Sequence, residues 1–487
     1  MILLKLINKK LFVGILTMAL VSCSDPWSNR ENNGDDNLNA TLTEAITNTS
    51  ETSKFAELLV QSGYDKILSA SKTYTVFAPT NAAMSQVDAS LLDTPQELEA
   101  FVQNHIALTA YSSIRDKTSE QIKMLGPKYL LFKGATAIGD ATIITADKYA
   151  ANGVFHIVNK ALSPKQNIWQ YINSLTATSA MSNYLVSLNE LNIYDSDILA
   201  KENAIPGALA DSLSNSFLKN VYNVNNEKNS YTLFLIEDEG YTAEVDKLKP
   251  YLNKPTADST ATYSGYFTVR DMVFPKAYMP SELPNELTTR FGVTVPIDKT
   301  QIVGEPIVLS NGVIYRIKKM DVPLINRLVT TKIEGENNVS FVPSNLRSKI
   351  FYREQKGPDG IFFKDVMVYN SGVTLFQLNY KANDLFSTKY KVYWRAINNY
   401  NSTATVFQQR LIIGTVIRDN VNYPDEAIKN FGFQNVDVGF YGEVYLGEFT
   451  LTNSQDIDKI TLFGANTITA GSNTMSLDYL KFVPVVK

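Results

Sequence analysis

The chain has few of the residues that build common catalytic and metal sites. Its 487 residues include one cysteine and two histidines. A lone cysteine cannot form an intramolecular disulfide, and two histidines leave no room for a metal site of three histidines. The sequence lacks the G-x-S-x-G, G-x-G-x-x-G and P-loop patterns, and His105 and His156 lie too far apart for H-E-x-x-H. We therefore expect a protein that is not an enzyme.

A strong charge of either sign is also missing. The chain has 45 basic and 49 acidic residues, which gives a net charge of −4. A protein without a basic excess neutralises phosphates poorly, so we expect no nucleic acid partner. Hydrophobic residues make up 44% and charged residues 19%, which is the composition of a globular protein. The length predicts two to four domains.

The N-terminus carries an export signal. Three lysines within residues 1–10 precede an apolar run over residues 11–21, which is too short to span a bilayer. The run ends in L-V-S-C and resembles the bacterial lipobox, in which the cysteine is acylated and becomes the first residue. The resemblance predicts a signal peptide over residues 1–22. It also predicts that Cys23 carries acyl chains such as palmitate, which attach the protein to the membrane. An ordinary signal peptide with a chance cysteine is the alternative.

The segment over residues 23–40 is rich in Asn and Asp and poor in core-forming residues, so we expect a flexible tether. Its Ser24-Asp25 and Asp35-Asp36 pairs resemble the acidic segment that follows the lipidated cysteine in surface lipoproteins of the Bacteroidota. The resemblance implies a lipid-anchored protein of the outer membrane that faces the cell exterior. A lipoprotein that faces the periplasm is the alternative.

Two motifs and a helix characterise the next segment. Residues 75–81 read TVFAPTN, and residues 152–159 read NGVFHIVN. Between them, His105 follows an aliphatic helical pattern. Together these features resemble the fasciclin domain, which we place at residues 41–163. The resemblance implies a module for adhesion or interaction.

Both histidines of the chain fall within this segment. His105 lies on the apolar face of its predicted helix, and His156 lies within a predicted strand. We interpret both as core histidines whose ring nitrogens are bonded to the backbone, and not as catalytic groups.

A second, diverged copy follows at residues 164–324. Residues 231–234 (YTLF) repeat residues 74–77 (YTVF), and residues 311–315 (NGVIY) repeat residues 152–156 (NGVFH), at spacings of 157 and 159 residues. Two matches at nearly one period indicate a duplication. The hydrophobic pattern has persisted while the polar residues have changed, which suits a scaffold better than an active site.

Short β-like runs separated by Gly, Asn and Asp fill residues 325–487, and they predict an antiparallel β-sandwich. The runs at 390–395 (YKVYWR) and 476–484 (SLDYLKFVP) resemble strands of the jelly-roll carbohydrate-binding modules. The predicted fold class is therefore α+β, with two tandem fasciclin-like domains followed by an antiparallel β-sandwich of the jelly-roll type.

The resemblance implies a ligand site built from exposed aromatic residues, which stack on sugar rings, and from polar neighbours, which orient the hydroxyl groups. Trp394 alternates with apolar residues, so we expect it in the core. Packing is the alternative role for each residue of the predicted site. The predicted ligand-binding residues are Tyr393, Tyr400, Tyr423, Asn398, Asn399 and Asp425.

A structural calcium site is the one cofactor that the resemblance suggests. Glu334, Glu336 and Asp478 resemble the acids that hold calcium in some of these modules. Three carboxylates are few for an ion that takes six to eight oxygen ligands. The alternative is a chain with no cofactor.

These patterns together predict a non-enzymatic cell-surface lipoprotein that serves adhesion or glycan binding and assists polysaccharide capture at the outer membrane. Its predicted partners are the membrane, through the N-terminal lipid, and a glycan or a cell-surface protein. One alternative is a structural partner of an outer-membrane complex with no ligand of its own. Another is a divergent glycoside-active enzyme, because paired acids can meet in the fold without a sequence motif.

Overall fold

The computed structural model describes residues 39–69, 73–114, 119–188, 215–400, 404–414, 416–418, 421–423 and 427–486. The predicted signal peptide, Cys23 and most of the predicted tether lie outside these ranges, as does Asp425. The chain divides into two compact units. The first contains residues up to 171 with 224–230 and 308–312, and the second contains residues 172–223, 231–307 and 313–487.

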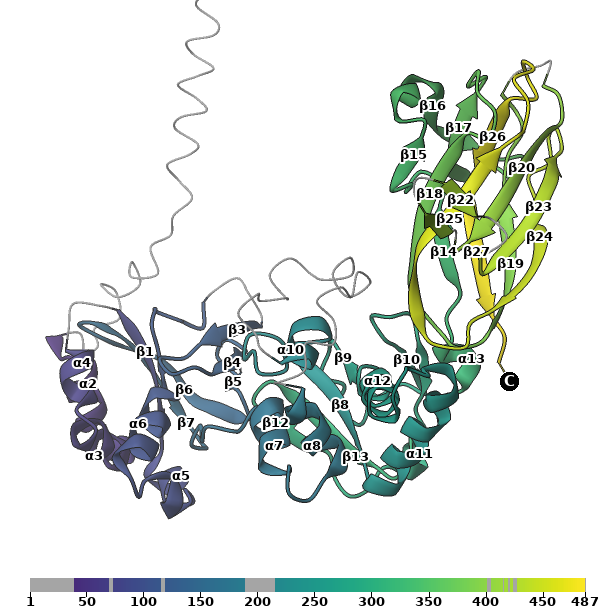
Figure 1. The fold of residues 1–487 in the computed structure, drawn as a ribbon. Helices are drawn as coiled ribbons and strands as arrows, with labels where there is room; N and C mark the ends of the chain where they lie inside the picture. Colours follow the sequence, from purple (N-terminus) through teal and green to yellow (C-terminus); the bar gives the residue numbers. More distant parts are fainter. Residues whose placement is uncertain are drawn as a thin grey trace, which may run out of the picture. The chain divides into compact units, whose positions relative to one another are not determined.

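A seven-stranded sheet forms the centre of the first unit, with strand order β2-β1-β7-β6-β5-β4-β3 (Figure 1). Its strands are β1 (Tyr74–Pro79), β2 (Ile106–Ala107), β3 (Glu120–Lys123), β4 (Tyr129–Phe132), β5 (Ala137–Ile138), β6 (Ala141–Ala150) and β7 (Gly153–Val158). Its helices are α2 (Leu42–Thr47), η2 (Ser50–Thr52), α3 (Ser53–Gln61), α4 (Tyr64–Leu68), α5 (Asn81–Met84), η3 (Ala89–Leu91), α6 (Pro95–Gln103) and the start of α7 (Ile168–Ser174).

Two helices begin at the capping boxes that the sequence contains. The Thr41 side chain accepts from the backbone of Glu44, whose carboxylate accepts in return from Thr41. Thr94 and Glu97 form the same reciprocal pair at the start of α6, where Pro95 occupies the first turn. Each pair satisfies backbone N–H groups that have no partner inside the helix.

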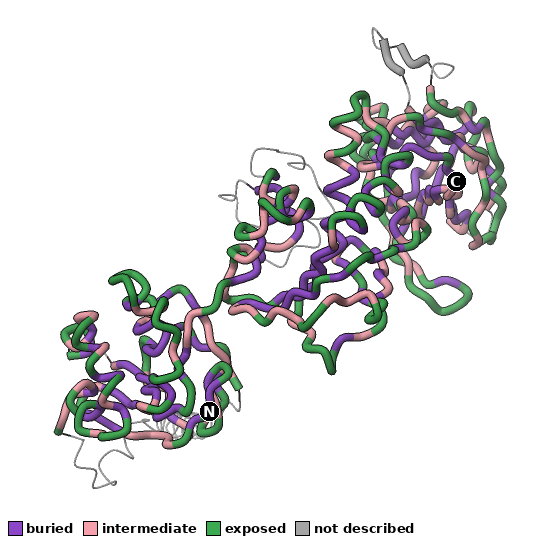
Figure 2. Tube along the Cα trace, turned by 90° about the horizontal axis from the view of Figure 1, so that it is seen from below, coloured by how far each residue is buried: buried purple, intermediate pink, exposed green. Residues whose placement is uncertain are grey.

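The strand β1 is buried on both faces because two apolar clusters enclose it. Val76 and Ala78 pack with the helices in one cluster, and Phe77 packs with Phe132 and Ile138 in the other. β1 pairs in parallel with β7 along its whole length. The motif strands therefore form the structural centre of this unit. Figure 2 colours the trace by burial and shows buried stretches alternating with exposed ones.

The second copy lies mostly in the second unit. Its main sheet has the order β12-β13-β8-β9, and β10 and β11 form a separate pair. The strands are β8 (Tyr231–Ile236), β9 (Val273–Phe274), β10 (Glu286–Thr288), β11 (Thr294–Pro296), β12 (Ile307–Leu309) and β13 (Gly312–Ile317). The helices are α8 (Ala180–Ser187), α10 (Ser216–Asn220), α11 (Asp238–Leu248), η4 (Lys249–Tyr251), α12 (Ala257–Val269), η5 (Lys299–Gln301) and α13 (Leu324–Arg327).

The repeated asparagines show that the two copies are built alike. Asn152 Oδ1 accepts from the backbone N–H of Leu42 at 2.8 Å, and Asn311 Oδ1 accepts from Ile168 N–H at 2.9 Å. Each asparagine thus fixes the start of the first helix of its copy to the turn before the last motif strand. The same hydrogen bond at both positions supports the duplication that the sequence indicates.

The rest of the second unit is an antiparallel β-sandwich, as predicted. Its sheets have the orders β14-β27-β19-β24, β15-β18-β25-β20-β23, β16-β17-β26 and β21-β22. The first strands are β14 (Thr331–Glu334), β15 (Ser340–Val342), β16 (Ile350–Lys356), β17 (Phe362–Tyr369), β18 (Gln377–Leu385), β19 (Lys389–Arg395) and β20 (Phe407–Ile413), with η6 (Ser344–Lys349) between β15 and β16. The remaining strands are β21 (Val416–Arg418), β22 (Val421–Tyr423), β23 (Lys429–Val436), β24 (Val444–Thr450), β25 (Gln455–Gly464), β26 (Thr474–Leu477) and β27 (Tyr479–Pro484).

Large aromatic side chains fill the core between these sheets. Trp394, Tyr380 and Tyr390 are fully buried, which confirms the core position expected for Trp394. The sequence predicts a separate domain on each side of residue 324, whereas the second copy and the sandwich fall into one compact unit. Bonds such as the one from Ser387 N–H to the Tyr251 carbonyl, at 2.7 Å, join them.

No helix within the described ranges is long and apolar enough to cross a membrane.

Candidate functional site

Tyr393 lies on the outward face of the sheet β14-β27-β19-β24, as its alternation with buried Trp394 predicts. Its ring centroid lies 5.3 Å from that of Tyr445 on β24, and Tyr445 is 51% exposed. The ammonium group of Lys481 on β27 lies 4.9 Å from the Tyr393 centroid. Neighbouring strands therefore present two tyrosine rings and a cation side by side on one surface.

A second row of side chains continues this surface. Tyr479 donates its hydroxyl to the Glu443 carboxylate at 2.7 Å, and Lys481 forms an ion pair with the same carboxylate. Arg395 is paired in register with Tyr479, two residues along β19 from Tyr393. We call Tyr393, Tyr445 and Tyr479 the aromatic strip. Glu443 and Lys481 connect its members.

The strip leads into a pocket of ≈ 320 Å³. The hairpin between β16 and β17 supplies one wall, and β19, β27 and the segment before β24 supply the others. We call it the Arg395 pocket. It is lined by Asp359, Ile361, Phe363, Arg395, Tyr441, Gly442, Glu443 and Tyr479.

The guanidinium of Arg395 organises the floor of this pocket. It forms an ion pair with the buried Asp478 carboxylate, donates from Nε to the Tyr441 carbonyl at 2.7 Å, and lies 4.5 Å from the Phe363 ring centroid. The rings of Phe363 and Tyr441 meet edge to face at 6.3 Å. Because Arg395 is held from three sides, the two rings of the pocket are held in a fixed arrangement.

The two acids near Arg395 titrate differently. Burial raises the pKa of Asp478 to about 6, although Arg395 opposes the shift. Burial also acts to raise the pKa of Glu443, but the hydrogen bonds from Lys481 and Tyr479 outweigh it and the pKa falls below its usual value. Glu443 is therefore ionised near neutral pH and accepts hydrogen bonds. Burial is the main cause that raises the pKa of Tyr479, and the nearby Glu443 adds to the shift. Tyr479 therefore stays a neutral hydrogen-bond donor.

Asn399 supports the pocket from behind. Its Nδ2 donates to the Tyr441 hydroxyl at 3.1 Å and to Gln355 Oε1 at 2.6 Å, and its Oδ1 accepts from Arg353 at 3.2 Å. The sequence predicts that the Asn399 amide contacts the ligand directly. In the structure, this amide is instead bonded to the pocket residue Tyr441, so Asn399 positions Tyr441.

Asn398 and Tyr400 do not belong to this surface. Asn398 is fully buried, and its Nδ2 donates to the carbonyls of Thr405 and Val436 at 3.0 and 2.9 Å. The Tyr400 hydroxyl accepts from Thr405 N–H at 3.1 Å, and its ring packs 4.9 Å from that of Tyr369. Both residues stabilise the fold, and the buried amide of Asn398 does not support the predicted ligand contact. The polar loop composition does not reveal that its amide points inward.

The structure does not describe the side chains of two predicted ligand residues. Tyr423 ends β22, and the structure describes only its backbone. Asp425 lies outside the described residues. Their predicted roles stay predictions.

The three acids predicted to bind calcium do not form one group. Glu334 pairs with Lys332 at 2.9 Å, and Asp478 pairs with Arg395. Glu336 lines a different hollow, together with Tyr352, Arg353, Glu354 and Lys364. Within the described parts of the chain, no three His, Cys, Asp or Glu side chains form a group that could hold a metal ion. Because basic neighbours already neutralise two of the acids, their placement does not support a shared calcium site.

Sequence reasoning missed most of the pocket residues. Arg395 and Tyr479 carried a signal, because each alternates with buried neighbours along its strand. Tyr441 stood out only as one of several aromatic residues in a Gly-containing stretch. Phe363 and Asp359 carried none, since their place beside β19 depends on how the hairpin folds back onto another sheet.

The first unit also contains a pocket, of ≈ 380 Å³, but its lining differs in kind. It has no aromatic ring, and its lysines are engaged, Lys128 with Glu227 and Lys165 with Asp140. A site without an aromatic face offers little to a sugar ring. It is lined by Ala100, Asn104, Gly126, Pro127, Lys128, Pro164, Lys165, Gln166 and Gln170.

Comparison with known proteins identifies a fasciclin domain in the first unit. Residues 50–164 match the family model described as "Fasciclin domain". Protein sll1483 of Synechocystis sp. (strain ATCC 27184 / PCC 6803 / Kazusa) is 30% identical over 106 residues, which cover 20% of this chain. The match spans 58% of the length of that protein.

Solved structures resemble both parts of the chain. A FAS1 domain pair from the insect cell adhesion molecule fasciclin I is 16% identical and covers 57% of this chain and 98% of its own, with a TM-score of 0.21. The C-terminal CBM6 of LamC, a marine laminarinase from Zobellia galactanivorans, is 11% identical and covers 32% of this chain and 99% of its own, with a TM-score of 0.20.

Proposed function

We propose that this protein is a non-enzymatic, lipid-anchored protein of the outer cell surface that binds a glycan through the sandwich. The observation that carries the proposal is the Arg395 pocket, where the rings of Phe363 and Tyr441 stand beside the Glu443 carboxylate and the Tyr479 hydroxyl. Sugar rings present C–H groups on their faces and hydroxyls on their rims. Aromatic faces and fixed polar groups match these two surfaces.

The aromatic strip extends the site beyond one sugar unit. From the pocket, Tyr479, Lys481 and Tyr393 continue across adjacent strands to Tyr445. A flat row of this kind suits a chain of sugars better than an enclosed small molecule. Because contacts between proteins and sugars of this kind are shallow, we expect weak binding, with a Kd of about 0.01 to 1 mM.

The arrangement of acids argues for binding without catalysis. Hydrolysis of a glycosidic bond uses two carboxyl groups that face the substrate. Asp478, whose pKa is raised to about 6, is paired with Arg395 and does not line the pocket. Fasciclin domains are non-catalytic in general and adhesive in type, which agrees with a protein that attaches and captures.

The anchor is part of the proposal. Cys23 follows the export signal in the pattern of a lipobox, and we propose that its acyl chains hold the protein at the outer membrane, where it assists polysaccharide capture. Cys23→Ala should leave the protein unlabelled by palmitate and release it from the membrane fraction. Labelling of that variant would refute the anchor.

A glycan-array screen of the full-length protein in detergent tests the binding function. Phe363→Ala should remove any reproducible signal, because Phe363 is a wall of the pocket. Phe362→Ala is the matched control, since Phe362 is 67% exposed on the same hairpin and does not line the pocket. If the array shows no binding, or if Phe363→Ala binds like the original protein, the assignment fails. The structural-partner alternative would then gain support.

A further inference from the structure

The charges around the Arg395 pocket are almost completely paired. Arg395 forms an ion pair with Asp478, and Lys481 forms an ion pair with Glu443. Asp359 is the remaining charged residue of the lining, and it has no cationic partner within the part of the chain that the structure describes. Lys332 lies 4.0 Å from the Tyr479 ring centroid and is itself paired with Glu334, so these seven groups together leave one negative charge.

Neither cation can turn to an acidic ligand without a cost. Only 4% of the Asp478 side chain is exposed, so a ligand that drew Arg395 away would leave a buried carboxylate without its partner. Arg395 is also fixed by its bond to the Tyr441 carbonyl. Lys481 is shared between Glu443 and the Tyr393 ring.

The pocket does offer groups that suit hydroxyls. Glu443, held ionised, is an acceptor beside the Tyr479 ring, and Asp359 presents a second carboxylate from the hairpin turn. Asp359 Oδ1 accepts from Ile361 N–H at 3.0 Å, which fixes the position of its side chain. Carboxylates accept hydrogen bonds from neutral hydroxyls and repel carboxylates and sulfates.

From this charge arrangement we infer that the Arg395 pocket selects neutral glycans and discriminates against uronic acids and sulfated sugars. The inference rests on the proposed function, because it names the class of ligand that the same site takes. Like charges about 6 Å apart weaken binding about threefold at the dielectric constant of water and about a hundredfold at that of a protein surface, so for a partly exposed site we expect a loss of roughly tenfold. The discrimination should shrink in about 0.5 M salt, where exposed charges are screened.

The test compares each polymer with its own acidic form. Soluble glucan, galactan and mannan are each titrated into the full-length protein, beside the same polymer with its C6 hydroxymethyl groups oxidised to carboxylates. We expect at least one neutral polymer to bind, and its oxidised form to bind about tenfold more weakly at low salt. Equal or tighter binding of the oxidised form, abolished by Phe363→Ala, overturns the inference and leaves the proposed function standing. If no polymer of either kind binds, both fall.

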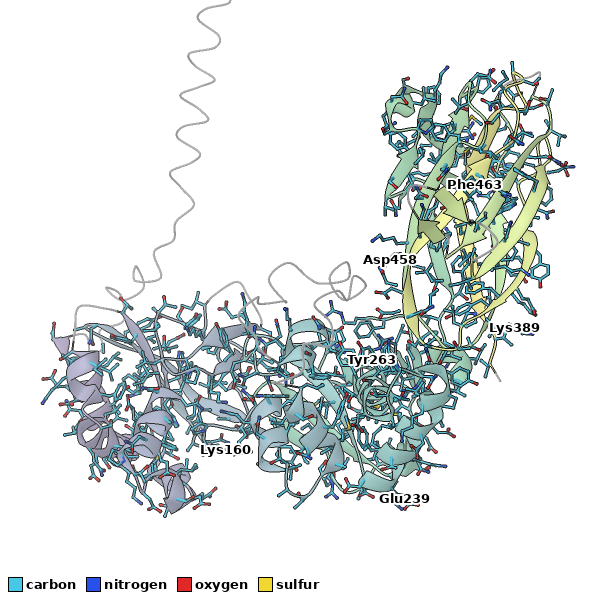
Figure 3. The ribbon with its side chains drawn as sticks, viewed as in Figure 1. Lys160, Glu239, Tyr263, Lys389, Asp458 and Phe463 are labelled. Atoms are coloured by element: carbon cyan, nitrogen blue, oxygen red, sulfur yellow. The ribbon has the colours of Figure 1, made fainter. Side chains whose placement is uncertain are left out.

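A pair of charge variants tests whether Asp359 is the cause. Asp359→Asn removes the unpaired charge and keeps an oxygen that can accept from Ile361. The ratio of neutral to acidic affinity should fall about threefold or more. Asp458→Asn makes the same change in net charge on β25, outside the pocket lining, where the side chain is 85% exposed (labelled in Figure 3), and should leave the ratio unchanged. Equal ratios in Asp359→Asn and the original protein would contradict the inference.

Discussion

His156 and Tyr315 occupy the same position in the two fasciclin-like copies and use different atoms to make the same bond. His156 stacks on Phe77 at 5.3 Å, and its Nε2 donates to the carbonyl of Tyr111 at 2.7 Å. Tyr315 stacks on Phe234 at 5.6 Å. Its hydroxyl donates at 2.7 Å to the carbonyl of a second tyrosine, residue 278.

The equivalence extends to the threonine that is the second residue of each motif strand. Thr75 Oγ1 accepts from the backbone N–H of Tyr111 at 2.7 Å, and Thr232 Oγ1 accepts from that of Tyr278 at 2.8 Å. A donor from β7 or β13 and an acceptor from β1 or β8 thus hold the same loop in each copy. The histidine is therefore a structural donor, as expected for a core residue, and a tyrosine can replace it.

Replacing His156 by tyrosine should remove part of the acid sensitivity of the first unit. Burial is the main cause that lowers the pKa of His156 in the folded state, whereas an unfolded histidine titrates near 6.5. Below pH 6.5 the unfolded chain binds a proton that the folded chain does not, so stability falls as the pH falls. At pH 5 this loss is at most about 2 kcal/mol. Denaturant unfolding of the original protein and of His156→Tyr at pH 7 and pH 5 measures the difference.

His105 serves as the internal reference for that comparison. Burial lowers its pKa to about 4, against the hydrogen bond from Nδ1 to the Phe101 carbonyl at 2.8 Å. It stays in both proteins, so its contribution cancels. If the two proteins lose the same stability between pH 7 and pH 5, His156 does not carry the effect.

Tyr315→Phe should destabilise the second copy without changing its packing. The ring stays against Phe234, but the Tyr278 carbonyl loses its donor, which costs about 1 to 3 kcal/mol where the acceptor stays buried. Tyr445→Phe, at a residue that is half-exposed, should change stability by less than about 0.5 kcal/mol. Thermal unfolding of the two variants compares them directly. Equal melting temperatures would show that the Tyr278 carbonyl finds water instead.

The sequence predicts this part of the fold well because the constraints are local. The motif strands are apolar on both faces, and the capping boxes at Thr41 and Thr94 mark helix starts by residue type alone. The loop partners Tyr111 and Tyr278 could not be predicted, because their carbonyls meet the motif side chains only after the loops close. No residue type identifies a backbone acceptor.

On the ligand surface, too, features set by local sequence could be predicted, and contacts between distant residues could not. Alternation along β19 correctly predicts that Trp394 is buried and that Tyr393 is partly exposed. The pocket joins side chains from β17, β19, β27 and two loops, which are far apart in the sequence and belong to different sheets. Asn398 and Asn399 look alike in sequence, yet one is buried and the other is half-buried. Only the direction in which each side chain points distinguishes them.

Removal of Arg327 should strongly destabilise the second unit. Its guanidinium lies 3.0 Å from Glu244 and 3.6 Å from Asp271, and all three side chains are at most 4% exposed. Burial raises the pKa of Asp271, and Arg327 is the main cause that opposes the shift. Arg327→Met removes the cation that two buried carboxylates share and leaves Glu244 only Lys247 and Asp271 only the more distant Arg270, which costs up to about 3 to 5 kcal/mol.

An exposed ion pair provides the control for Arg327→Met. Arg316 and Glu237 lie 3.4 Å apart with side chains 50% and 42% exposed, so Arg316→Met should cost less than about 1 kcal/mol. The Arg327 variant should also lose less stability than the original protein as the pH falls, because loss of Arg327 lets burial raise the pKa of Asp271 further, so that Asp271 takes up a proton in the folded state. Urea unfolding at pH 7 and pH 5 measures both effects. Similar costs for the two variants at pH 7 would contradict the role of burial.

Alanine substitutions of the neighbouring residues Asn398 and Asn399 should have different effects, the first on stability and the second on glycan binding. Asn398→Ala leaves two carbonyls without their donor, at residues 405 and 436, so unfolding should become easier by about 1 to 3 kcal/mol. Asn399→Ala removes the amide that holds the Tyr441 hydroxyl in place, so glycan affinity should fall by about threefold to tenfold. Its stability should change less than that of Asn398→Ala, because Asn399 is only partly buried. Calorimetric titration with an array-selected glycan and thermal unfolding, run on both variants, give the two readouts. The reverse pattern, with binding lost in the folded Asn398 variant and kept in the Asn399 variant, would restore the direct ligand contact that the sequence predicts for Asn398 and remove the positioning role of Asn399.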